Sequence, residues 1–183
     1  PTLSALIQQV DQVDIDALYR FHRALELAIA KALSDSMEQQ YLRLQAVKTF
    51  SAEGPAIADR ALKNVLLHYL SALGGTEASD RVVQQYQDSH NMTCRFAALS
   101  SACYFNLACV DDLLAQFYQR YQEEALVLDK WFALQASSPT MGDVARVTQL
   151  LRHEKFSMKN PNKVRSVIGA FAQGNPVQFH KPD

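Results

Sequence analysis

Apolar residues recur every three to four positions along most of the chain, the spacing that gathers them on one face of an α-helix. Two stretches show this most clearly, at 18–33 and 62–73. Both are predicted to be amphipathic helices whose apolar faces pack inward. The faces consist of Leu18, Phe21, Leu25, Ala28, Ile29, Ala32 and Leu33 in the first, and of Leu62, Val65, Leu66, Tyr69, Leu70 and Leu73 in the second.

Shorter helical patterns fill the rest of the chain, with Tyr41, Leu44 and Val47 inward in one of them. The stripe at 96–107 lies among Ala and Ser residues, which let neighbouring helices approach closely, so we expect that helix to be central. The other stripes are at 82–86, 113–121, 126–134 and 144–151.

Helix starts and stops separate these patterns. Gly74-Gly75 is expected to end the helix that carries the stripe at 62–73. Asn91 is expected to cap the helix that carries the stripe at 96–107. Thr140, with Asp143 three residues on, resembles a capping box that starts another helix. No stretch has the pattern of a strand. The chain is therefore predicted to be all-α, as a single helical domain over 1–183.

Helices joined by tight turns lie antiparallel to their neighbours. We expect the helix pairs to stack as an armadillo/HEAT-like superhelix. The sequence shows no strict period, so the repeat is expected in the structure and not in the sequence.

The stretch 156–180 starts two short helices at Asn-Pro pairs, because Asn caps free N–H groups and Pro fits the first helical position. After Asn160-Pro161, one apolar stripe is expected, with Lys163 and Arg165 pointing away from it and Asn162 near the helix entrance. The stripe consists of Val164, Val167, Ile168 and Phe171.

Composition is that of a folded globular protein, with 48% apolar and 20% charged residues. No apolar run reaches the roughly 18 residues that a membrane span needs, and the first residues lack the pattern of a signal peptide. The cysteines at 94, 103 and 109 form no CxxC pair. We interpret them as free, mostly buried thiols in a reducing cytosol.

Charge is uneven along the chain. Residues 1–151 carry 12 Lys and Arg against 17 Asp and Glu, while residues 152–183 carry 6 against 2. A basic end could face an acidic partner, although six positive charges are more often a solvated or internally paired surface. Nucleic-acid binding is therefore disfavoured.

The residues offer no catalytic constellation. His153-Glu154 begins like the zinc motif HExxH, but Ser157 stands where the second His should be. Gly74-Gly75 is not followed by the residues of a phosphate-binding loop. We predict no catalytic residue, no metal ligand and no cofactor in this chain, which by itself should be inactive.

Three stretches, 129–139, 160–171 and 175–183, together resemble the C-terminal helical domain of the bacterial aminopeptidase N family, zinc-dependent alanyl aminopeptidases of the gluzincin group. The resemblance implies that the zinc and the catalytic groups lie in an upstream catalytic domain of the same polypeptide. This chain would be a fragment of a longer C-terminal domain. That domain would cap the catalytic cavity of a cytoplasmic enzyme that removes N-terminal residues from peptides, and would restrict the access of substrates.

The same resemblance places Asn162, Lys163 and Arg165 along the substrate channel. Arg is the commoner residue of the family at position 163, and Lys163 cannot form the bidentate contacts of a guanidinium. The alternative function is a stand-alone helical-repeat module that binds other proteins. A weaker alternative is that the basic residues of 152–183 form a surface that binds nucleic acid. Neither a nucleic acid nor a membrane is an expected partner.

Overall fold

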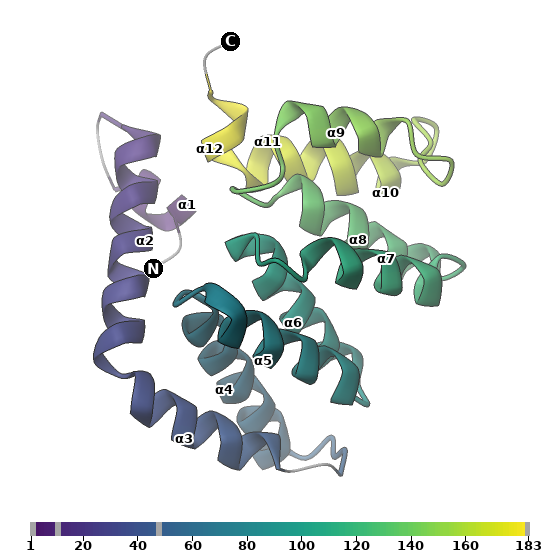
Figure 1. Cartoon of the computed structure of the whole chain (residues 1–183). Coiled ribbons are helices and arrows are strands. Elements are labelled where there is room, and N and C mark those ends of the chain that lie inside the picture. The colour runs from purple at the N-terminus through teal and green to yellow at the C-terminus, as the bar shows by residue number, and fades with distance from the viewer. Residues whose placement is uncertain (1–2, 10–11, 47–48, 182–183) are drawn as a thin grey trace. The chain divides into compact units, whose positions relative to one another are not determined.

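The structure of the chain is a computed structural model that describes residues 3–9, 12–46 and 49–181. Every regular element in these ranges is a helix, which confirms the all-α prediction (Figure 1). Within the same ranges, no helix combines the length and the apolar content that crossing a bilayer requires.

The helices follow one another with short connectors. In chain order they are α1 Leu3–Ile7, α2 Ile15–Ala32, α3 Ser34–Gln45, α4 Gly54–Ser71, α5 Gly75–Asp88, α6 Met92–Phe105, α7 Val110–Tyr121, α8 Ala125–Ala136, α9 Val144–Leu151, α10 Pro161–Val164, the π-helical η1 Arg165–Gly169, α11 Ala170–Gly174 and α12 Pro176–Phe179.

Local chemistry sets several of these boundaries. Asp14 accepts a hydrogen bond from Ala17 N (2.8 Å) and starts α2. Between α4 and α5, Gly74 and Gly75 have φ angles of 71° and 76°, a left-handed conformation that favours glycine and confirms the predicted stop. Asn91 caps α6 as predicted, with its side chain accepting from Cys94 N at 2.9 Å.

The cap of α9 corrects one expectation. Asp143 itself is the N-cap, because its carboxylate accepts a hydrogen bond from Arg146 N at 2.7 Å. Thr140 instead pairs with the hydroxyl of Ser138, before the helix begins. The predicted capping box was therefore wrong by three residues.

The chain divides into two compact units, which we describe one at a time. The central unit is Ala24–Leu113, and the terminal unit is Pro1–Arg23 together with Leu114–Asp183. A single domain over 1–183 stays a prediction.

The central unit is built from consecutive helix pairs. α3 packs against α4, α5 packs against α6, and the pairs join through contacts between α4 and α6. On α6, seven residues are buried, among them Ala98, Leu99 and Ala102, so the prediction of a central helix is confirmed within this unit. Pairs of helices stacked in this way are the unit of armadillo-type repeats, in agreement with the predicted fold class.

The apolar stripes of α2 and α4 are only partly buried, which corrects the expectation that they pack inward. On α4 the buried side chains are Leu66, Leu67 and Leu70. Large apolar side chains of both stripes are exposed, namely Phe21, Leu25, Leu33, Leu62, Val65 and Leu73. Position in a helical stripe predicts an apolar face but not whether a neighbour covers it. Val47, expected to point inward, lies outside the described residues.

The terminal unit packs around α8, which contacts α9, α10, η1 and α11. Phe117, Phe132 and Val167 are fully buried there, and Trp131 donates a hydrogen bond from its indole N–H to Leu114 O at 3.0 Å. The expectation that Trp131 belongs to the core is therefore confirmed.

All three cysteines are free thiols, as expected. Cys94 and Cys103 are buried, and Cys109 is half-buried. Burial raises the pKa of the Cys109 thiol, which disfavours the reactive thiolate.

Candidate functional site

The first candidate site surrounds the predicted channel residues, on the helix that starts at Asn160. The Asn160 side chain accepts a hydrogen bond from Asn162 N at 3.0 Å, and Pro161 occupies the first helical turn, as the sequence predicted. From there the chain continues without a break through α10, η1 and α11 to Gly174.

A π-helical segment, η1, follows α10 within this helix. Ala170 N donates to Arg165 O, five residues back, which is the hydrogen-bond pattern of a π-helix. The wider turn rotates the following side chains relative to an α-helix. Between 163 and 168 the buried residues are Lys163, Ser166 and Val167, whereas Ile168 of the predicted stripe is exposed.

Lys163 is inside the unit, not on its surface, which corrects its expected outward direction. Only 6% of the residue is exposed. Its ammonium group forms an ion pair with Asp129 at 2.7 Å and lies 5.3 Å from the centre of the Phe132 ring. The Ala125 carbonyl accepts a further, longer hydrogen bond at 3.4 Å. A buried cation must be paired, and the Asp129 carboxylate on α8 supplies that pairing.

Asn162 and Arg165, the other two predicted residues, are exposed. Arg165 lines an open hollow with Ser137, Gly169, Ala170, Gln173 and Gly174. Within the described residues, no carboxylate lies within ion-pair distance of Arg165. Its guanidinium therefore remains available to an anion or a carbonyl group in this hollow.

The loop between α8 and α9 supports one side of the hollow. The Asn175 amide, 1% exposed, donates from Nδ2 to the carbonyls of Ala136 (3.1 Å), Ser138 (2.8 Å) and Gly142 (3.0 Å). Its Oδ1 accepts from Gln178 N and thereby caps α12, as the second Asn-Pro pair predicted.

Gly142 is required by this close packing. A Cβ atom there would lie 2.5 Å from Gln135 O and 2.7 Å from Ala136 O, which no side chain tolerates.

An aromatic cluster in the same unit had no sequence signal, because its members come from three separate stretches. The His153 ring lies 5.1 Å from Tyr118, 5.5 Å from Trp131 and 5.4 Å from Phe132, centre to centre. Its Nδ1 accepts a hydrogen bond from Lys155 N at 3.1 Å. Burial lowers the pKa of His153, so the neutral ring is favoured.

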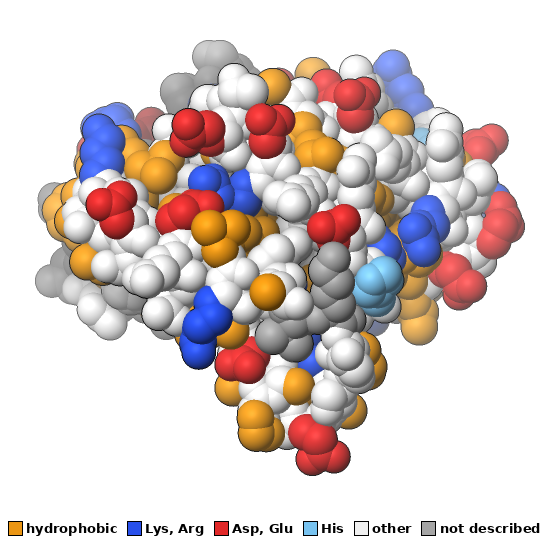
Figure 2. All heavy atoms as spheres, turned by 60° about the horizontal axis from the view of Figure 1, so that its bottom comes forward, with side chains coloured by type: hydrophobic (Ala, Val, Ile, Leu, Met, Phe, Trp, Pro, Cys, Tyr) orange, Lys and Arg blue, Asp and Glu red, His pale blue; other side chains and the backbone are white. Residues whose placement is uncertain are grey.

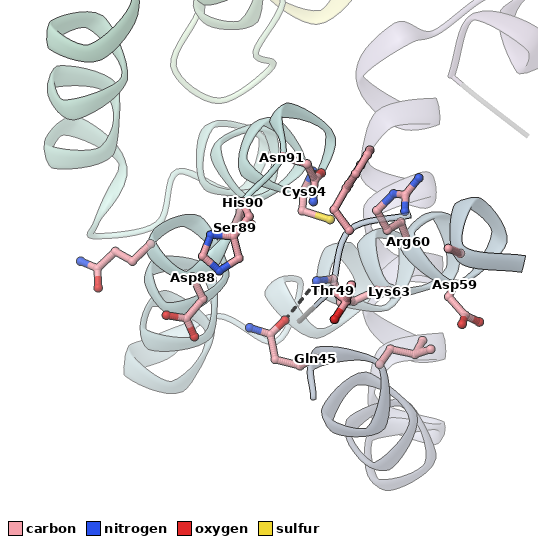
Figure 3. A pocket seen from close by; sticks show the side chains of 14 residues that line it. Gln45, Thr49, Asp59, Arg60, Lys63, Asp88, Ser89, His90, Asn91 and Cys94 are labelled. Atoms are coloured by element: carbon pink, nitrogen blue, oxygen red, sulfur yellow. Dashed lines mark hydrogen bonds between the residues drawn. The ribbon is translucent and has the colours of Figure 1, made fainter. Parts of the chain in front are cut away.

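The second candidate site is a pocket of about 230 Å³ in the central unit. It lies where the end of α3, the connector to α4 and the turn from α5 to α6 come together (Figure 3). Asp88, Ser89 and His90 lie on one side of the pocket, and Lys63, Thr49 and Gln45 on the other. Sequence reasoning missed this pocket because none of these residues belongs to a motif.

Metal chemistry has no donor set in the described residues. No group of three or more His, Cys, Asp or Glu side chains is close enough there to hold an ion. His153 is enclosed by aromatic rings, and Ser157 replaces the second His of the zinc motif. The described residues therefore offer no ligand set for a zinc ion.

Comparisons with known proteins match the whole chain. The family described as "Domain of unknown function (DUF3458_C) ARM repeats" covers residues 1–183. Aminopeptidase N of Escherichia coli K12 is 37% identical over 184 residues, and aminopeptidase N of Haemophilus influenzae is 36% identical over 169 residues. These matches cover 100% and 92% of this chain but only 21% and 19% of the relatives.

A solved structure agrees with the sequence matches. Legionella pneumophila aminopeptidase A, in complex with aspartic acid, superposes with a TM-score of 0.85 at 28% identity, over 98% of this chain and 22% of that one. The chain thus spans about a fifth of the length of the proteins that it matches. It belongs to the family of ARM-repeat domains described as DUF3458_C, and it is homologous to the C-terminal part of bacterial aminopeptidase N.

Proposed function

We propose that this chain is the non-catalytic helical part of a cytoplasmic zinc aminopeptidase that removes N-terminal residues from peptides. The observation that carries the proposal is the alignment of the whole chain with one fifth of aminopeptidase N. Zinc and the groups that activate water would belong to a catalytic domain of the same polypeptide. The helical part would cap the catalytic cavity and restrict which peptides enter.

Within this function, Arg165 and Asn162 contact the peptide substrate in the channel. The exposure of both side chains and the hollow beside Arg165 support this assignment. Lys163 contributes by position: its ion pair with Asp129 anchors α10 to α8, so that the residues on either side of it are presented in a fixed direction.

Exposed apolar side chains on α4 and in the turn after it support a large partner. Leu62, Val65 and Leu73 are each at least 40% exposed in the described structure. Large apolar side chains exposed on one helix and just after it are a feature of protein interfaces. The partner that we propose is the catalytic domain of the same polypeptide.

Kinetics of the full-length enzyme test the channel role. We expect Arg165→Ala to lower kcat/KM about tenfold on peptides of three or more residues, the loss of one charge-assisted hydrogen bond, with little change on an alanine arylamide. Arg152→Ala is the matched control, since Arg152 is also exposed but lies outside the hollow. Equal kinetics of both variants on long and short substrates would remove Arg165 from the channel.

A stand-alone protein-binding module is the second candidate. The ARM-repeat family and the uncovered face of α4 favour it, because both suit a scaffold that binds partners. The two functions differ in the size of the natural polypeptide, since only the peptidase requires a catalytic domain in the same chain.

The charges do not favour a nucleic-acid surface. Lys155 pairs with Glu123 at 3.0 Å and Lys163 pairs with Asp129 at 2.7 Å, so part of the basic end is neutralised internally. On the face shown in Figure 2, acidic and basic side chains are interspersed and form no continuous basic field. Nucleic-acid recognition needs such a field.

A further inference from the structure

Buried hydrogen bonds link the helices beside the pocket of the central unit. The buried amide of Gln85 joins all four helices around it. Gln85 accepts from Tyr41 OH at 3.1 Å, and donates to Asn64 Oδ1 at 2.9 Å and to Cys94 O at 3.0 Å. The network thereby joins α3, α4, α5 and α6 next to the pocket, whose lining includes Cys94.

Both rims of the pocket are also fixed. The buried guanidinium of Arg95 donates to the carbonyls of Tyr86 and Ser89, which holds the turn that carries Asp88 and His90. On the opposite rim, Arg60 donates to Ser51 O at 2.6 Å and stacks over Phe50 at 4.9 Å. A preformed concave site of this kind is typical of small-ligand sites.

Charged groups on the two sides of the pocket lack partners of opposite charge. In the part of the chain that the structure describes, the hydrogen-bond partner of Lys63 Nζ is a neutral acceptor, Gln45 Oε1, at 3.2 Å (Figure 3). Among the described residues, no carboxylate lies within ion-pair distance of Lys63, and no basic side chain lies within that distance of Asp88. The lining therefore presents Lys63 on one side and Asp88 on the other, with Asp59 and Arg60 as further charged groups on the α4 side.

Apolar side chains contribute to the remaining lining. Leu44, Phe50 and Ala56 lie along the rim and the wall formed by α3 and α4. A ligand that fits this arrangement has a carboxylate, an ammonium group and an apolar side chain within a volume of about 230 Å³. These are the features of a free α-amino acid.

We propose that the pocket between the α3–α4 connector and the α5–α6 turn binds a free apolar α-amino acid. Lys63 pairs with the carboxylate of the ligand, and Asp88 pairs with its ammonium group. The site is separate from the proposed peptidase function, because neither residue lies in the hollow around Arg165 and because the readout is binding.

Calorimetric titration of the full-length protein tests the site with L-leucine as the probe. Two analogues each lack one charge: 4-methylpentanoate has no ammonium group, and 3-methylbutylamine has no carboxylate. We expect L-leucine to bind at least tenfold more tightly than either analogue, since each loses one charge-assisted interaction.

Variants separate this site from any other that binds amino acids. Lys63→Met and Asp88→Asn should each weaken L-leucine binding about tenfold, whereas Lys63→Arg should retain it. Lys159→Met and Asp80→Asn are the matched controls, since both residues are exposed and lie outside the pocket. Asp88 is exposed, so its replacement tests binding without disturbing the fold.

Three results would overturn the proposal. One is the absence of L-leucine binding to the wild-type protein. Another is binding that the Lys63 and Asp88 variants leave unchanged, which would place the amino acid at another site. The last is an analogue with a single charge that binds as tightly as L-leucine.

Discussion

The ion pair between Lys163 and Asp129 ties the candidate channel helix to the core of its unit. Both groups are largely buried, and the Phe132 ring covers the ammonium group. In such surroundings the loss of one partner leaves the other charge buried and unpaired, which costs more than the pair itself contributes.

Removal of one partner should therefore destabilise the protein strongly. We expect Lys163→Met to lower the free energy of unfolding by about 3 kcal/mol, and the double variant with Asp129→Leu to recover much of that loss. Chemical denaturation of the intact protein measures both. Lys155→Met is the control: its partner Glu123 is 80% exposed, so the loss of this pair should cost much less.

A loss in Lys163→Met no larger than that in Lys155→Met would show that solvent reaches Lys163. Lys163 would then return to the residues that contact substrate directly, as the sequence alone suggested.

His153 gives the same unit a dependence on pH. Burial lowers its pKa below the ordinary value of 6.5, with Lys155 and Lys163 acting in the same direction and Glu154 opposing them. The unfolded chain therefore binds this proton more readily than the folded chain. The contribution of His153 to stability is complete above pH 6.5 and declines as the pH falls through that value towards the folded pKa.

Thermal unfolding between pH 7.5 and 5 measures this effect. We expect His153→Phe to reduce the loss of stability on acidification relative to the wild type, because the aromatic cluster keeps a ring that does not titrate. Mutation of the exposed His180 should leave the wild-type pH dependence intact. Parallel curves for the wild type and His153→Phe would contradict the account.

Among the helices, the continuous stretch α10–η1–α11 was predicted well at its ends and poorly in its middle. Asn160-Pro161 and Gly174 are local signals, and the helix starts and stops there. The π-helical turn has no local sequence signal, and the predicted stripe placed Ile168 inside and Lys163 outside, the reverse of what the structure has.

Asn175 was likewise predicted only in part. The sequence predicted its role as a cap but not the three carbonyls that its amide binds, because those lie in a loop far away along the chain. A distant partner of this kind has no local sequence signal.

Replacement of Asn175 tests how much the loop between α8 and α9 depends on this amide. Asn175→Ala removes three donated hydrogen bonds and a helix cap, so we expect a loss of about 3 kcal/mol in the free energy of unfolding. Asn162→Ala, an exposed asparagine on the same stretch, should cost less than about 0.5 kcal/mol. Similar losses in the two variants would mean that the loop holds its conformation without Asn175.

For the molecule as a whole, the exposed apolar face of α4 predicts association. The sequence identified its stripe but could not say that part of it would remain uncovered. We expect the isolated 183-residue chain to self-associate in sedimentation velocity, and Leu62→Glu with Val65→Glu to shift it towards monomer. A monodisperse wild-type monomer would contradict this prediction.

The most direct test of the central claim concerns the natural polypeptide that carries this chain. An antibody raised against the chain captures that polypeptide from its source cells, and the intact mass and the hydrolysis of an alanine arylamide are then recorded. The account predicts a polypeptide several times longer than 183 residues, with aminopeptidase activity that a chelator removes. An inactive polypeptide of about the same length as this chain would contradict the account and would favour an independent helical scaffold.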